Sequence, residues 1–194
     1  MMIDYQLLHE SIHFYESYDY QRIETPWLVT KAISDITKPP GASSYVVKKD
    51  CETKEKVFVA SGEQGFLYLI NKGHLPSEGQ FQTITPCMRN DSFDQIHTKY
   101  FMKNELIWYS PKVMCADNAL IVAQHALKFF KLMAPNASMK IVNTGDLSWD
   151  IELDGVEIGS YGVRKSLICN WVYGTGLAEP RFSTLVKASY GRIS

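Results

Sequence analysis

The stretch Gly174-Thr-Gly-Leu-Ala-Glu-Pro-Arg181 combines two closely spaced glycines with an arginine that directly follows a proline. The glycines predict a corner at 174–176, where the backbone can approach a ligand or a neighbouring strand closely. A helix is expected over 180–189, which places Arg181 in its first turn. Because a helix N-terminus already carries positive partial charge, an arginine there is electrostatically unfavourable for the helix alone. The stretch therefore favours an anionic partner for Arg181.

A second arginine stands at the predicted end of a strand, in the sequence Pro86-Cys-Met-Arg89-Asn-Asp91. The planar guanidinium of Arg89 can bind a phosphate through two parallel hydrogen bonds. The neighbouring Asp91 can orient that guanidinium or accept a hydrogen bond from an adenine amino group. The alternative interpretation is a surface ion pair between Arg89 and Asp91.

Carboxylates gather in the run from Asp150 to Arg164. Asp150 and Glu157 lie near the two ends of a predicted hairpin whose turn is Asp154-Gly155. Together the two side chains could hold a hard divalent cation through oxygen. The alternative is that these acids simply face water.

Composition indicates one soluble globular domain over residues 1–194, with 45% hydrophobic and 21% charged residues. The formal charge of −1 provides no global basic field for nucleic acid. No apolar run is long enough to span a bilayer, and the N-terminus lacks a secretory signal pattern. The four cysteines form no CxxC pair, which excludes a zinc ribbon and favours reduced thiols in the cytoplasm.

Periodicity predicts short helices alternating with β-rich stretches and shows no repeat. The expected helices span 5–17, 28–36, 63–72, 117–133 and 180–189, and Asp117 is the expected N-cap of the longest. The expected strands span 20–25, 45–49, 56–60, 80–88, 98–109, 139–143, 149–153, 157–160 and 167–172. This order predicts one α+β domain built on a mainly antiparallel sheet. His9, His13, His74 and His125 show no ligand spacing and are expected to be structural.

Taken together and in order, these stretches resemble the signature motifs of class II aminoacyl-tRNA synthetases. Tyr20–Leu28 resembles motif 1, an extended segment that ends at a proline after a helix. Arg89-Asn-Asp91 resembles the Arg-x-Glu of motif 2, with aspartate in place of glutamate. His97–Glu105 is similar to the His-x-x-x-Phe-x-x-x-Glu that follows motif 2 in the family. Gly174–Arg181 resembles motif 3.

The third motif departs from the family at two positions, since Ala178 replaces the third glycine and Pro180 replaces the glutamate before the arginine.

Ser61-Gly-Glu63-Gln64 resembles the loop that holds the amino group of the substrate amino acid. The run from Asp150 to Arg164 resembles the aspartyl, asparaginyl and lysyl branch. Within it, Glu157–Arg164 is also similar to the ammonia-dependent asparagine synthetase.

The resemblance implies a class II synthetase-like antiparallel sheet flanked by helices, dimeric through the motif 1-like segment. It also implies a ligase that joins an amino acid carboxylate to the α-phosphate of ATP and releases pyrophosphate, with Mg²⁺ as cofactor. Arg89 is then expected to bind the α-phosphate and Phe101 to stack on adenine. Arg181 would cover the other face of adenine and reach the γ-phosphate, and Asp91 and His97 would complete the ATP site.

The remaining roles implied by the resemblance concern the metal and the substrate. Asp150 and Glu157 are expected to hold Mg²⁺ beside ATP. The residues expected to contact the amino acid are Ser61, Glu63, Gln64, Glu105, Ser160 and Arg164. Among these, Glu63 would bind the ammonium group and Arg164 an acidic or amide side chain.

Thirteen residues follow Arg181 and one helix precedes the motif 1-like segment, so no anticodon-binding domain is expected. The chain is therefore predicted to be an adenylating ligase that passes its amino acid to a small amine, a carrier protein or another acceptor besides a full tRNA. One alternative is a minimal tRNA-charging core helped by a partner. The other is a non-catalytic paralogue that serves in ligand sensing or dimerisation. No DNA or membrane partner is expected.

Overall fold

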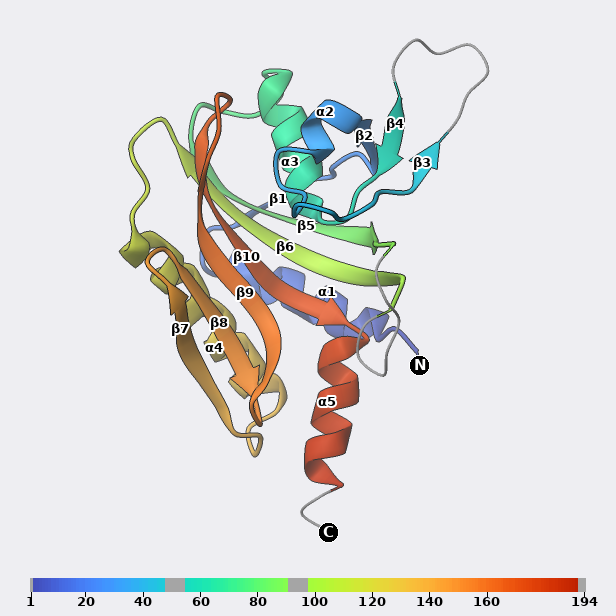
Figure 1. The fold of residues 1–194 in the computed structure, drawn as a ribbon. Helices are drawn as coiled ribbons and strands as arrows, with labels where there is room; N and C mark the ends of the chain where they lie inside the picture. The colour runs from blue at the N-terminus through green and yellow to red at the C-terminus, as the bar shows by residue number, and fades with distance from the viewer. Residues whose placement is uncertain (1, 48–54, 91–97, 192–194) are drawn as a thin grey trace.

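The computed structural model describes residues 2–47, 55–90 and 98–191 (Figure 1). Its elements are α1 (Tyr5–Glu16), β1 (Gln21–Arg22), β2 (Leu28–Thr30), α2 (Lys31–Ser34), β3 (Val46–Val47), β4 (Lys56–Phe58), α3 (Gly62–Asn71), β5 (Gly79–Met88), β6 (Tyr100–Ser110), α4 (Ala116–Met133), β7 (Met139–Gly145), β8 (Ser148–Leu153), β9 (Val156–Lys165), β10 (Asn170–Glu179) and α5 (Arg181–Tyr190). Asp91, His97 and residues 48–54, which connect the predicted strands 45–49 and 56–60, lie outside the described residues.

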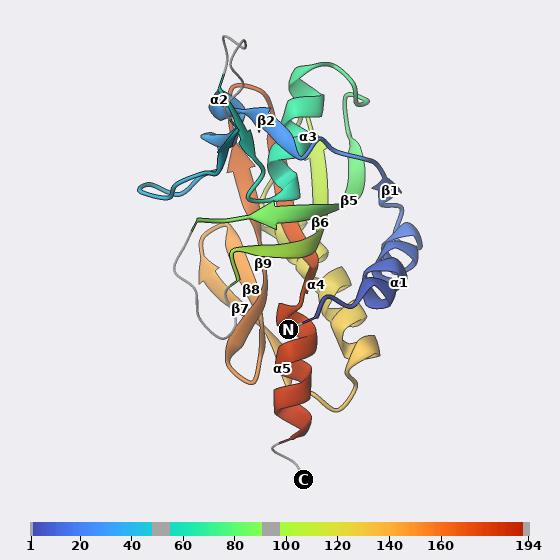
Figure 2. The same ribbon diagram turned by 90° about the vertical axis from the view of Figure 1, so that its right-hand side faces the viewer.

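A seven-stranded sheet in the order β1-β5-β6-β10-β9-β8-β7 forms the centre of the molecule. Its neighbouring strands are antiparallel except for the short parallel pair β1 and β5. A smaller sheet, β2-β4-β3, lies beside α2 and α3 on one side, and α1 and α4 lie on the other (Figures 1 and 2). The predicted α+β class, an antiparallel sheet flanked by helices, is confirmed.

Two apolar clusters hold the layers together, one on each face of the large sheet. On the first face, aromatic and aliphatic side chains of α4, such as Phe129 and Phe130, pack against the sheet and α1. On the second face, α3 and the small sheet bury Phe66 and Phe81 against Trp171. Since α3 covers only part of this second face, the remaining part of the sheet is left free to line a cavity.

The glycine-rich segment is a strand and not the predicted corner. β10 continues through Gly174 and Gly176, with a register shift against β6 between Thr175 and Leu177. A Cβ on Gly174 would stand 2.7 Å from Val122 Cγ1, and one on Gly176 would stand 2.9 Å from Tyr15 Cε2. These glycines therefore permit close packing of α4 and α1 on the sheet, and a strand ladder overrides the local turn preference of glycine.

We expect the substitution Gly174→Ala to destabilise the protein by about 2 kcal/mol, because the new methyl group overpacks the contact with Val122 and Tyr161. Urea unfolding of the variant would measure this loss. Gly191→Ala is the matched control, because its Cβ would meet no atom closer than 3.4 Å. Equal midpoints for wild type and Gly174→Ala would show that the helix–sheet contact is not tight.

Three further expectations need correction. The segment 28–36 is not one helix, because Leu28–Thr30 pairs with β4 and only Lys31–Ser34 is helical. The N-cap of α4 is Cys115, whose backbone N–H donates to Asn118 Oδ1 at 2.9 Å, and not Asp117. β9 extends past residue 160 to Lys165, so Arg164 lies within a strand.

Candidate functional site

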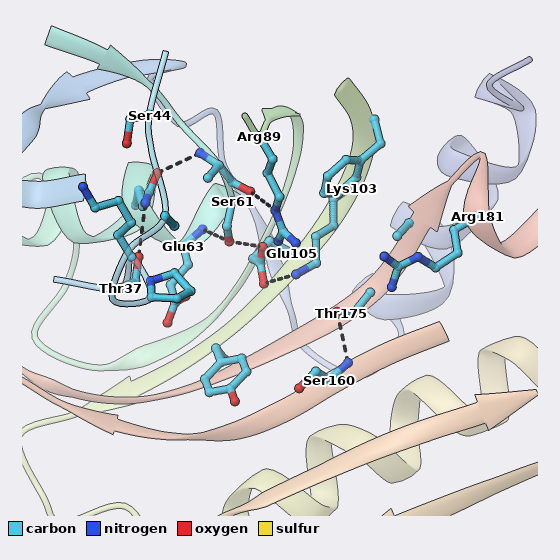
Figure 3. Close-up of a pocket in the computed structure, with 18 of the residues that line it drawn as sticks. Thr37, Ser44, Ser61, Glu63, Arg89, Lys103, Glu105, Ser160, Thr175 and Arg181 are labelled. Atoms are coloured by element: carbon cyan, nitrogen blue, oxygen red, sulfur yellow. Dashed lines mark hydrogen bonds and ion pairs between the residues drawn. The ribbon is translucent and has the colours of Figure 1, made fainter. Parts of the chain in front are cut away.

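A cavity of about 390 Å³ lies over the part of the large sheet that α3 leaves uncovered (Figure 3). Strands β6, β9 and β10 form its floor, and the segment 37–44 with the start of α3 forms its wall. Its lining residues include Thr37, Lys38, Ser44, Ser61, Glu63, Gln64, Arg89, Phe101, Lys103, Glu105, Glu157, Ser160, Arg164, Tyr173, Thr175 and Arg181. A cavity of this size is typical of small-molecule sites.

Strand β6 supplies three lining side chains by simple alternation. Phe101, Lys103 and Glu105 point to the cavity, whereas Leu106 belongs to the core on the helix face. Ile107, the next residue on the cavity side, is buried in the cluster under α3. The cavity therefore begins where the pattern on this face changes from apolar to charged.

Two arginines from distant parts of the chain line this one cavity. Arg89 directly follows β5, where its Nε donates to the Ala60 carbonyl oxygen at 3.1 Å and its guanidinium lies 5.1 Å from the centre of the Phe101 ring. Arg181 lies in the first turn of α5, as predicted, and its Nη1 donates to Glu157 Oε1 at 3.3 Å. Both guanidinium groups thus line the same cavity.

Glu105 is completely buried, with both oxygens hydrogen-bonded. Lys103 Nζ donates to its Oε1 at 2.8 Å, and Ser61 Oγ donates to its Oε2 at 2.6 Å. Figure 3 shows this chain of contacts between the start of α3 and β6. Because a buried carboxylate is costly without partners, these contacts hold the Glu105 side chain in place.

A second buried carboxylate, Glu63, lines the cavity as well. Its Oε1 accepts a hydrogen bond from Trp171 Nε1 at 2.6 Å, and its Oε2 accepts one from Arg164 Nη1 at 2.9 Å. Burial raises the pKa of Glu63, and the charge of Arg164 opposes that effect. The Arg164 guanidinium also stacks 4.3 Å from the centre of the Tyr173 ring. Glu63 and Arg164, which the sequence assigns to two different substrate groups, therefore bind each other.

Gln64 holds the wall of the cavity through its hydrogen bonds. Its Oε1 accepts from the Ala60 N–H at 2.8 Å, and its Nε2 donates to the Ser34 carbonyl oxygen at 3.2 Å. Ser160 lines the floor, where its N–H donates to Thr175 Oγ1 at 3.4 Å.

The two predicted metal ligands are placed differently. Glu157 lines the cavity, whereas Asp150 does not line it and lies beside Ser160, its partner across the β8–β9 ladder. The pKa of Asp150 is raised, chiefly by burial and further by the charges of Glu157 and Glu152, whereas a hydrogen bond with Ser160 lowers it. Within residues 2–47, 55–90 and 98–191, no group of three His, Cys, Asp or Glu side chains could hold a metal ion.

The structure adds residues that the sequence analysis missed: Lys103, Tyr173, Thr175 and the 37–44 segment. The signal for Lys103 is the alternation Phe101-x-Lys103-x-Glu105 in a strand, which places a lysine between two predicted site residues on one face. The segment 37–44 contains the helix-breaking run Lys38-Pro-Pro-Gly41, and nothing local shows that it covers a cavity.

The described thiols are unpaired and take no direct part in the site. Cys87, Cys115 and Cys169 are free, and burial raises the pKa of Cys87 to about 12. Among the helices of the described chain, none is long and apolar enough to cross a membrane.

The chain matches no known family profile, and no curated protein matches it in sequence. Solved structures do resemble it. The cytoplasmic serine-tRNA ligase of Naegleria fowleri, in complex with AMP, aligns with a TM-score of 0.73 and 17% identity, over 93% of this chain and 52% of that one. This chain therefore spans about half the length of that ligase.

Two further similar structures come from Desulfitobacterium hafniense. PylSc, a pyrrolysyl tRNA synthetase, aligns with a TM-score of 0.74 and 12% identity, over 95% of this chain and 67% of that one. A second pyrrolysyl-tRNA synthetase structure aligns with a TM-score of 0.71 and 11% identity, over 95% of this chain and 69% of that one. At these identities the likeness concerns the fold. The chain therefore has a class II aminoacyl-tRNA synthetase-like fold.

Proposed function

We propose that this chain activates an amino acid with ATP. A carboxylate oxygen of the amino acid attacks the α-phosphorus, the bond from that phosphorus to the bridging oxygen breaks, and pyrophosphate leaves with the bond's electrons. The observation that carries the proposal is the convergence of Arg89 and Arg181 on one cavity. No protein nucleophile is required, because positioning and charge stabilisation suffice for this transfer.

The charges of the cavity support an anionic ligand. Lys103 is paired with Glu105, and Arg181 is paired with Glu157. Arg89 contacts a backbone carbonyl and an aromatic ring, and no carboxylate in the described part of the chain pairs with it. Its charge is thus available to a phosphate, for which the forked guanidinium geometry is well suited. The Phe101 ring beside it offers a stacking surface for adenine.

Of the two predicted ligands, one is placed to bind Mg²⁺ directly. Glu157 lines the cavity, and Mg²⁺ commonly binds one or two carboxylates together with substrate phosphates and water. Asp150, which lies beside Ser160 and does not line the cavity, would contribute negative charge near the ion. The bound ion would neutralise part of the charge of the triphosphate.

The substrate end of the cavity supports a polar amino acid. Glu63, Glu105, Ser61 and Arg164 line it, with Tyr173 as the aromatic wall. An ammonium group can replace Arg164 as the partner of Glu63, which would free the guanidinium for a carboxylate or amide of the same substrate. We therefore favour aspartate or asparagine, in keeping with the aspartyl and asparaginyl branch.

We further propose that the acceptor is a small amine, a carrier protein or another group besides a full tRNA. A net charge of −1 provides few contacts for a tRNA backbone. We propose a single domain over residues 1–194, a homodimer formed through the motif 1-like segment Tyr20–Leu28, and action in the cytoplasm.

The test is exchange of labelled pyrophosphate into ATP, measured with each of the twenty amino acids. We expect exchange above background with aspartate or asparagine and none with large apolar amino acids. Uniformly flat exchange with ATP binding retained would contradict catalysis and favour the non-catalytic paralogue. Exchange followed by transfer to tRNA would favour the minimal tRNA-charging core instead.

A further inference from the structure

The exposed face of α1 brings two histidines together, and neither of them lines the cavity. His9 and His13 are one helical turn apart and both are exposed. Their Nε2 atoms are 3.2 Å apart, and the two rings meet edge to face with centroids 4.5 Å apart. His9 and His13, which the sequence analysis expects to be structural, therefore lie side by side on the helix surface.

Glu16 determines which nitrogen of His13 is free. Its Oε2 lies 3.0 Å from His13 Nδ1 and accepts the hydrogen on that nitrogen. In a neutral imidazole only one nitrogen carries a hydrogen, so the Nε2 lone pair of His13 faces His9. A carboxylate that accepts from the outer nitrogen of a histidine is also the arrangement that orients metal-binding histidines.

The distance between the two Nε2 atoms matches the distance between neighbouring nitrogen ligands of one transition-metal ion. Nitrogens that bind one ion at about 2.0–2.1 Å in neighbouring coordination positions are themselves about 3.0–3.4 Å apart. We infer that His9 and His13 chelate one divalent transition-metal ion, such as Ni²⁺, Cu²⁺ or Zn²⁺, with Glu16 orienting His13. Hard ions such as Mg²⁺ and Ca²⁺ are not expected to bind to this pair, because they prefer oxygen ligands.

The site has two protein ligands, and water completes the coordination. No third His, Cys, Asp or Glu joins the pair within the described residues, which makes the site open and its affinity moderate. Its effect would be to clamp one turn of α1. That helix contacts the large sheet, where Tyr15 donates a hydrogen bond to the Gly176 carbonyl oxygen at 2.8 Å. The clamp therefore stabilises a helix that packs against the sheet beneath the cavity.

Isothermal titration calorimetry of the full, untagged chain with NiCl₂ tests the inference. We expect one Ni²⁺ per chain, with binding lost in His13→Gln and in His9→Gln. Glu16→Gln should retain the stoichiometry and bind about tenfold more weakly, because the orienting carboxylate is removed. His74→Gln and Cys115→Ser are controls, since both residues are exposed and neither belongs to the pair.

A thermal melt gives an independent measurement on the same proteins. Ni²⁺ should raise the melting temperature of wild type and of the two controls, because it binds the folded helix in preference to the unfolded chain. It should leave that of His13→Gln unchanged. Absence of Ni²⁺ binding by wild type, or equal binding by His13→Gln, would overturn the inference. Both results are independent of whether the chain activates amino acids.

Discussion

Replacing Arg89 by alanine is expected to lower amino-acid-dependent pyrophosphate exchange by about a thousandfold. The guanidinium is positioned by the Ala60 carbonyl oxygen and by the Phe101 ring, and it has no carboxylate partner among the described residues. Its charge is therefore available for the charge that develops on the α-phosphate. Exchange rates measured at saturating ATP would report the loss of transition-state stabilisation.

Two variants separate this effect from a loss of structure. Lys140→Ala removes an exposed cation that pairs with Glu152 and does not line the cavity, and it should leave the exchange rate unchanged. Arg89→Lys keeps the charge but loses the planar fork, and should be intermediate. Wild-type exchange by Arg89→Ala, with the fold intact by circular dichroism, would rule out the assignment of Arg89 to the phosphate.

Replacing Lys103 by methionine is expected to destabilise the fold by about 3 kcal/mol. Lys103 Nζ lies 2.8 Å from Glu105 Oε1, and both side chains are almost fully buried. Removal of the cation leaves the Glu105 carboxylate in the interior with Ser61 as its remaining partner. Guanidinium unfolding would measure the loss through the midpoint and slope of the transition.

A double-mutant cycle provides the control. Glu105→Gln alone should also destabilise the protein, because it leaves Lys103 buried without a carboxylate. The double variant Lys103→Met with Glu105→Gln should recover most of the stability, since no unpaired charge remains. Additive losses in the double variant would show that the two residues are not coupled and that the ion pair contributes little.

The elements of the site were predicted most successfully where their signals are local. The strand that carries Phe101 and Glu105 follows from alternation, and the helix start at Arg181 follows from the proline before it. Both arginines could therefore be placed at the ends of elements from sequence alone. The resemblance to class II synthetases then indicated that the two arginines serve one site, and in the structure both line the same cavity.

The contacts that give the site its present form could not be predicted in this way. Glu63 and Arg164 are 101 residues apart, and Ser61 and Glu105 are 44 apart, so no local pattern relates the partners. The glycines of β10 were interpreted as a corner because glycine permits turns. They instead admit Val122 and Tyr15 from helices distant in sequence.

By itself, the sequence determined the α+β class, the positions of α1, α4, β5 and β6, and the two arginines at strand and helix ends. These features depend on periodicity and on chain-breaking residues, which act over a few neighbouring positions. Only the tertiary structure decided which charges are paired and that Lys103 belongs to the site. Such pairings depend on distances between side chains, which arise only when packing brings the elements together.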